Sequence, residues 1–283
     1  MGGCRVTVLF ALVASVVFGC ADFVGGAVSR RASPFRVAAL GQLVALCLAV
    51  PTALLVRWEQ VTAADAAWSL ASGLTAGCGL GLFYSAMARG LISLVVPLTA
   101  VISATLPVAY GLAQGERPGT PALFGVVLAL VAIAIVSATP GSGQTLSAAP
   151  IFFSLAAGTL FGLFIILLSQ VSDRAGLWPI ALSRSGSGLV LAGLALTLTG
   201  RQLHGLRPLL PAGIAIGTLE AGGIIALFLA LQRGPISIAS VLLSLYPVTT
   251  VLLATVVLGE RMSRTQLAGV ALALASVILI SAQ

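Results

Sequence analysis

Long uninterrupted apolar segments dominate this sequence, and each has about the length needed to cross a lipid bilayer as a helix. A transmembrane helix requires about 20 predominantly apolar residues. The segments are continuous and do not alternate with a period of two, which favours helices over β-barrel strands. The sequence therefore predicts an all-α membrane protein with ten transmembrane helices, at residues 5–27, 36–57, 67–87, 92–113, 121–138, 150–170, 178–199, 209–231, 236–258 and 265–282.

The composition supports lipid as the solvent of this chain. Hydrophobic residues make up 59% of its 283 residues and charged residues only 7%, whereas a soluble domain carries about 25% charged residues. The net charge of +7 comes from arginines scattered between the apolar segments, a pattern typical of anchors at membrane interfaces. No nucleic-acid partner is expected. The four cysteines and one histidine form no ligand pattern, so we expect no metal and no cofactor.

Three segments of the first half recur in the second half at a single ungapped spacing, since 233 − 89 = 144 and 259 − 115 = 144. Matches this far apart at one offset indicate a duplicated module. The matches are Arg89-Gly90 with Arg233-Gly234, Gly115-Glu116-Arg117 with Gly259-Glu260-Arg261, and Leu123–Leu130 with Leu267–Leu274.

The duplication divides the chain into residues 1–138, a polar linker at 139–149, and residues 150–283. Each half holds five predicted spans. Because five is odd, the second half enters the membrane from the opposite side, and the halves become inverted repeats around a pseudo-twofold axis in the membrane plane. Transporters built this way place their substrate site near the midplane, between the halves. We therefore expect a central cavity there.

The sequence resembles the drug/metabolite transporter superfamily, specifically its EamA type with two five-helix repeats. The resemblance rests on the two Gly-Glu-Arg turns, each followed by a Gly-containing apolar helix, and on the Arg-Gly turns. It also rests on Phe18-Gly19 in the first helix and its echo Phe161-Gly162. Arg184 occupies a position in helix 178–199 where the family often has Arg, and Gln42 replaces the corresponding Arg in helix 36–57.

The resemblance implies ten helices enclosing a cavity, with segments 121–138 and 265–282 at the side. It also implies a secondary transporter that moves a small metabolite, amino acid or drug across the cytoplasmic membrane by alternating access, in the export direction. The expected partners are a small-molecule substrate and the lipid bilayer, and protons are a candidate coupling ion. An intramembrane enzyme acting on a lipid-linked substrate is the alternative, although the sequence lacks HExxH and a Ser/His pair. A channel is a third hypothesis.

Only Asp22, Arg184 and Glu220 are ionisable and lie well inside predicted spans. Because a charge at the bilayer centre costs at least about 2.5 kcal/mol, such residues usually face a cavity or a partner. Glu220 lies about 16 Å along its predicted helix, near the bilayer centre. It could bind a substrate ammonium or take up a proton, form a fixed ion pair with Arg184, or stay protonated without a role. We expect Glu220→Gln to impair transport or its pH dependence and to leave folding intact.

The other two charged residues have alternatives of their own. Asp22 could line the mouth of the cavity or reach the interface beside Arg30 and Arg31. Arg184 could bind a substrate carboxylate, pair with Glu220, or extend to the interface.

Tyrosines and prolines complete the candidate site. Tyr84 and Tyr246 could stack on a substrate, or they could pack in the ordinary way. Pro97, Pro107 and Pro247 each remove a backbone donor and could act as hinges or simple bends.

Small residues and turns have structural interpretations. Glycines repeat every four residues in two of the predicted spans, a spacing that lets helices approach closely. We interpret these glycines as packing residues, and the turns that hold Glu116 and Glu260 as structural or gating turns. The glycines are Gly73, Gly77 and Gly81 in 67–87, and Gly213 and Gly217 in 209–231.

The arginines leave the orientation open. If the N-terminus is cytoplasmic, five arginines lie in the cytoplasmic connections and eight on the other side, which opposes the positive-inside rule. The family resemblance implies that both ends are cytoplasmic, and we adopt that orientation as the expectation.

Overall fold

The computed structural model describes residues 2–56, 60–89, 92–137, 148–199, 207–258 and 264–281. Most of the predicted linker and the Gly259-Glu260-Arg261 turn lie outside these ranges, and so does the side chain of Pro97. The described helices are α1 (Gly2–Ser29), α2 (Pro34–Leu55), α3 (Ala63–Arg89), α4 (Ile92–Ala113), α5 (Thr120–Ser137), α6 (Ala148–Ser169), α7 (Trp178–Thr199), α8 (Leu210–Leu231), α9 (Ile236–Leu243), α10 (Tyr246–Leu258) and α11 (Arg264–Ser281), with short 3₁₀ helices η1 (Asp173–Ala175) and η3 (Arg207–Leu209).

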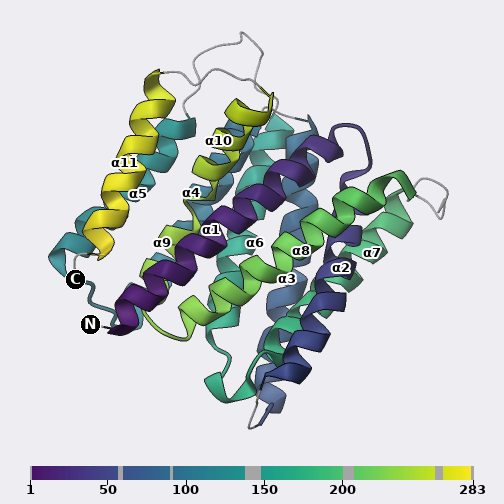
Figure 1. Cartoon of the computed structure of the whole chain (residues 1–283), viewed down its shortest axis with the longest axis horizontal. Helices are drawn as coiled ribbons and strands as arrows, with labels where there is room; N and C mark the ends of the chain where they lie inside the picture. The colour runs from purple at the N-terminus through teal and green to yellow at the C-terminus, as the bar shows by residue number, and fades with distance from the viewer. Residues whose placement is uncertain are drawn as a thin grey trace.

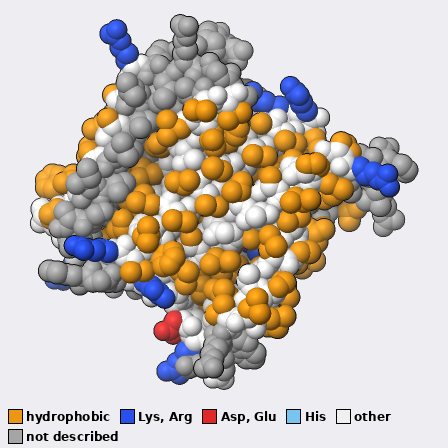
Figure 2. Space-filling view, in the orientation of Figure 1, with side chains coloured by type: hydrophobic (Ala, Val, Ile, Leu, Met, Phe, Trp, Pro, Cys, Tyr) orange, Lys and Arg blue, Asp and Glu red, His pale blue; other side chains and the backbone are white. Residues whose placement is uncertain are grey.

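An all-α membrane architecture is confirmed. Within the described ranges, six helices are long and apolar enough to cross a membrane, namely α1, α2, α3, α6, α7 and α8. Shorter apolar helical stretches cover 98–113, 123–132 and 236–250, and the count of ten spans stays a prediction. Figure 2 shows a face covered by hydrophobic side chains, with blue cationic side chains at its rim. This distribution is what a lipid-facing surface with interfacial arginines requires.

Helices of one half pack mainly against helices of the other half, and corresponding helices make equivalent contacts. Helix α1 packs against α8, and α6 packs in the same way against α3. Helix α8 also contacts α2, just as α3 contacts α7. The paired helices α5 and α11 lie side by side at one edge of the molecule (Figure 1), as the resemblance implies for the two segments at the side. Helix α1 begins and α11 ends at the same edge (Figure 1).

Glycines allow the closest of these approaches, as predicted. A Cβ on Gly73 of α3 would collide with the carbonyl oxygen of Ser183 in α7. A Cβ on Gly217 of α8 would lie 2.5 Å from the carbonyl oxygen of Gly41 in α2. Since 217 − 73 = 144, the two contacts sit at equivalent positions of the repeat. The packing interpretation of these glycines is confirmed.

The predicted span 236–258 is not one helix. Helix α9 ends at Leu243 and α10 begins at Tyr246, which leaves a break at Ser244 and Leu245. Pro247 has no backbone N–H, so the carbonyl of Leu243 has no helical donor four residues later. Val248 instead donates to the carbonyl of Leu245 at 2.9 Å. The proline therefore interrupts the span, whereas the sequence suggested a bend or hinge within a continuous helix.

Glu116, in the turn between α4 and α5, forms hydrogen bonds with the first residues of α9. The carboxylate of Glu116 accepts hydrogen bonds from the backbone N–H of Ile236 at 2.7 Å and of Ser237 at 3.1 Å. Amides at a helix N-terminus lack helical acceptors and carry partial positive charge, so a carboxylate satisfies them well. Gly115, with φ of 89°, lets the chain reverse there. Glu116 thus links the first repeat to the second.

Candidate functional site

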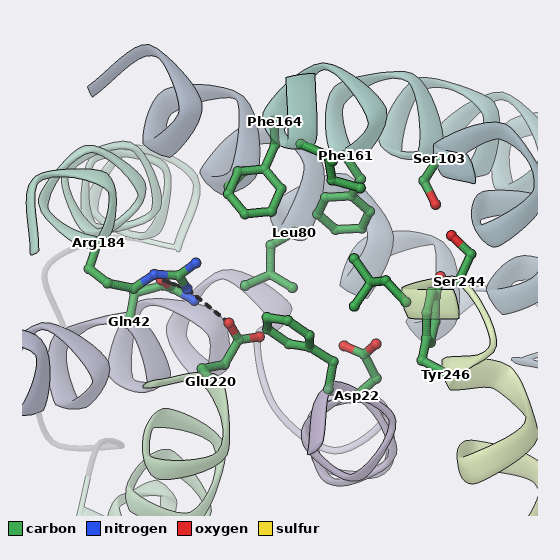
Figure 3. A pocket seen from close by; sticks show the side chains of 14 residues that line it. Asp22, Gln42, Leu80, Ser103, Phe161, Phe164, Arg184, Glu220, Ser244 and Tyr246 are labelled. Atoms are coloured by element: carbon green, nitrogen blue, oxygen red, sulfur yellow. Dashed lines mark hydrogen bonds and ion pairs between the residues drawn. The ribbon is translucent and has the colours of Figure 1, made fainter. Parts of the chain in front are cut away.

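A pocket lies between the two repeats, with about 630 Å³ of empty space that includes open solvent at its mouth. Figure 3 shows the side chains around it. Both halves of the chain contribute to its wall. The lining residues are Phe18, Asp22, Gln42, Ala76, Leu80 and Ser103 from the first half, and Phe161, Phe164, Ile165, Arg184, Glu220, Leu243, Ser244 and Tyr246 from the second.

One side of the pocket is apolar and aromatic. Phe161 and Phe164 project from α6, and Leu80 faces them from α3 (Figure 3). Helices α3 and α6 pack closely because Gly79 lets the ring of Phe161 approach the backbone of α3. The resulting surface suits the hydrophobic part of a solute.

A polar cluster forms the opposite side. Arg184 Nη1 donates to Glu220 Oε2 at 2.8 Å and to Gln42 Oε1 at 2.8 Å. Ser187 Oγ also donates to Gln42 Oε1, at 2.8 Å. The cluster joins α2 of the first half to α7 and α8 of the second. A buried ion pair keeps its place only when additional hydrogen bonds satisfy its remaining atoms, and Gln42 meets part of that need.

The cluster shows where Arg184 and Glu220 lie. The two side chains are paired, and both line the pocket, while a role of either residue in binding substrate or protons stays a prediction. Arg184 is buried and does not extend to the interface. Gln42, which replaces an expected arginine, meets Arg184 at the centre of the molecule.

Asp22 enters the pocket from α1 without such a partner. Its carboxylate points into the space between the polar cluster and Tyr246 (Figure 3). The residue is only 8% exposed. Within the part of the chain that the structure describes, Asp22 makes no hydrogen bond and no ion pair. The structure therefore favours the cavity position over the interface for this residue.

Of the two tyrosines predicted for the cavity, the structure places only Tyr246 there. Its hydroxyl donates to the carbonyl of Val96 in α4 at 3.2 Å, so the ring is held across the pocket wall. Tyr84 is fully buried, its hydroxyl lies against Gly25, and it is not among the lining residues. Its place in the core follows from the narrow contact between α1 and α3 at that glycine.

Pro107 and Pro247 are not among the described residues that line the pocket, and the side chain of Pro97 lies outside the described part of the chain. Pro247 lies two residues after the break at Ser244 and Leu245, and Leu243 and Ser244, on the other side of it, line the pocket. Helix α4 continues through Pro97 and Pro107. A hinge role for the three prolines stays a prediction.

Several wall residues escaped the sequence analysis, among them Leu80, Ser103, Phe164 and Ser244. An apolar or hydroxyl side chain in an apolar helix carries no signal that separates a pocket wall from ordinary core. Phe18 and Phe161 were not predicted as wall residues either, although each precedes a glycine in the motif shared by the two repeats, and that motif is a signal that could have found them.

Comparisons with known proteins agree with this architecture. The sequence profile of the EamA-like transporter family matches residues 5–138 and again residues 148–282. A search of the curated proteins finds no match. One solved structure, described only as "Crystal structure of protein", superposes with a TM-score of 0.74 at 15% identity, over 96% of this chain and 95% of the other. At that identity the likeness shows the fold alone.

Proposed function

The chain belongs to the EamA-like transporter family of the drug/metabolite transporter superfamily, and from this premise we propose that it carries a small molecule across the cytoplasmic membrane by alternating access. The proposed cargo is a metabolite, amino acid or drug, and the proposed direction is export. The observation that supports this most is the pocket, because both repeats contribute its wall. A solute held there touches the two parts that would move against each other.

The proposed motion follows from the repeats. If each repeat crosses the membrane five times, the two are inverted, and rocking one against the other opens a central site to alternate faces. The glycine contacts of α3 with α7 and of α2 with α8 supply close, smooth surfaces between the halves. The Gln42–Arg184–Glu220 cluster crosses the same boundary. Protons remain the candidate coupling ion, with Asp22 and Glu220 as the groups that would carry them.

Family membership supports transport ahead of the intramembrane enzyme. The deciding experiment reconstitutes the purified protein in liposomes and screens labelled amino acids, amines and other metabolites for uptake. We expect saturable uptake of an unaltered solute, with accelerated exchange when unlabelled solute is loaded inside. A chemically altered solute would support the enzyme instead, and uptake that never saturates would support a channel.

The orientation needs a separate measurement. We propose that both termini face the cytoplasm, against the arginine distribution. Fusion of a reporter that is active only in the cytoplasm to Gln283 checks this, and an inactive but intact fusion would reverse the assignment.

A further inference from the structure

The charges that face the pocket do not balance. Asp22, Arg184 and Glu220 are the charged side chains among the described lining residues. Arg184 neutralises Glu220 through their ion pair, so no described lining residue supplies a counter-charge for the carboxyl of Asp22. A buried charge without a partner is costly. The occupant that gains most from this pocket is therefore one that brings a single positive charge.

We propose that the pocket binds an organic monocation with an apolar body, and that its ammonium group rests on the carboxylate of Asp22. This assignment rests on the proposed transport function and names the chemical class of its substrate. It separates the two acids: Asp22 receives the substrate, and Glu220 holds Arg184 in place.

The groups that face Asp22 supply no positive charge to it. Asp22 interacts electrostatically with Glu220 from α8, with Tyr84 from α3 and with Tyr246 from α10. The guanidinium of Arg184 is taken up by Glu220 and Gln42, so it does not satisfy Asp22. No described basic residue other than Arg184 lines the pocket.

The opposite wall suits an apolar body. Phe161, Phe164 and Leu80 face the carboxylate across the pocket (Figure 3). Burial of apolar surface contributes about 25 cal/mol per Å², and aromatic faces also attract cations. A compact inorganic cation gains little there, because hard cations require six or more oxygen ligands. The described residues contain no group of three or more His, Cys, Asp or Glu side chains that could hold a metal.

The same geometry disfavours solutes that bind through a carboxylate. Such a carboxylate would compete with Glu220 and Gln42, which already share the Nη1 atom of Arg184. The Nε atom of Arg184 has no partner, but it has almost no accessible surface either, so a solute in the pocket does not reach it. This narrows the cargo class proposed above from metabolites in general to amines and quaternary ammonium compounds.

The test measures binding to the full chain in detergent by isothermal titration calorimetry. Benzyltrimethylammonium is the probe, because its charge does not depend on pH. The comparison compounds are benzyl alcohol, phenylacetate, phenylalanine and tetramethylammonium. We expect the probe to bind most tightly of the five. Asp22→Asn should weaken its binding about tenfold or more, and Asp22→Glu should retain most of it.

Asp173→Asn is the matched control, since it removes the same charge from an exposed acid in η1. Binding to this variant should be unchanged. The proposal is overturned if phenylalanine, phenylacetate or benzyl alcohol binds as tightly as the probe. It is also overturned if tetramethylammonium, which has no ring, binds as tightly as the probe. Unchanged probe binding by folded Asp22→Asn also overturns it. If Asp22→Asn does not fold, the relative affinities of the five compounds for the unmodified protein still test the proposal.

The binding assay separates this proposal from the proposed function. A probe that binds at Asp22 but never crosses a liposome membrane would keep the cation site and contradict transport. If the protein transports only neutral or zwitterionic solutes and does not bind the probe, the cation site is contradicted and the proposed transport function stands.

Discussion

Asp22, Arg184 and Glu220 show how far individual residues can be assigned from a sequence. A charge within a long apolar segment is conspicuous, so all three could be predicted to face a cavity or a partner. The Arg184–Glu220 pair was one of the predicted alternatives, but the sequence could not choose it, and it did not predict the contact of Arg184 with Gln42, 142 positions away. Such contacts depend on how α2, α7 and α8 cross. The contrast between a paired Glu220 and an unpaired Asp22 emerges only from the fold.

The ion pair adds a stability cost to the expected effect of Glu220→Gln. The sequence alone suggested that folding would be spared, but this change leaves the buried Arg184 without a counter-charge. Removing one partner of a buried pair costs roughly 3–5 kcal/mol. We expect a clearly lower midpoint of thermal unfolding in detergent, together with impaired transport.

A double variant isolates the pairing. Replacing both Arg184 and Glu220 with methionine removes both charges at similar side-chain size, and it should regain much of the lost stability. Equal midpoints for Glu220→Gln and the unmodified protein would show that the pair does not stabilise the fold.

At the scale of single elements, the helices were largely predictable and their interruption was not. The extent of the apolar segments predicted the first and last residues of α2 and α7 to within two residues. The break between α9 and α10 was missed, because a proline in an apolar segment is compatible with a bend, a kink or a break. Hydrogen bonds around Ser244 and Leu245 decide among these. Leu243, the last residue of α9, and Ser244, the first residue of the break, both line the pocket wall.

The contact of α3 with α7 can be tested by a single methyl group. In Gly73→Ala the new Cβ meets the backbone carbonyl of Ser183, so the helices must separate. Overpacking of this kind costs about 1–3 kcal/mol, and we expect a lower unfolding midpoint. Gly188→Ala in α7 is the control, because its Cβ meets no atom within 4 Å. That variant should be neutral or slightly more stable, and equal losses in both would contradict the packing argument.

The contact of Glu116 with α9 makes a second prediction at this scale. Glu116→Gln keeps the shape of the side chain but removes the charge that two helix amides share. We expect a loss of about 1 kcal/mol in the free energy of unfolding, measured as a shift in thermal midpoint. Arg117→Gln changes the charge of the exposed neighbour and should shift the midpoint less. A larger effect of Arg117→Gln would mean that Glu116 does not stabilise the start of α9.

At the scale of the whole molecule, the repeat predicted most of the arrangement. One offset of 144 residues, found in short motifs, anticipated two related units, and the family profile matches the chain twice, at residues 5–138 and 148–282. The same offset relates the glycine contacts at Gly73 and Gly217. The pocket wall was less predictable, because aromatic and serine residues in apolar helices look alike whether they face a cavity, a neighbour or lipid.

The central claim is that one pocket between the repeats is reached from each side of the membrane in turn. Replacing Cys4, Cys20, Cys47 and Cys78 and introducing Ser103→Cys gives a single thiol in the pocket wall. Membrane-impermeant thiol reagents are then applied to either face of oriented vesicles. We predict labelling from both faces, with a bound solute slowing both reactions. A thiol that reacts from neither face, or that reacts from one face only under every condition, would contradict alternating access to this pocket.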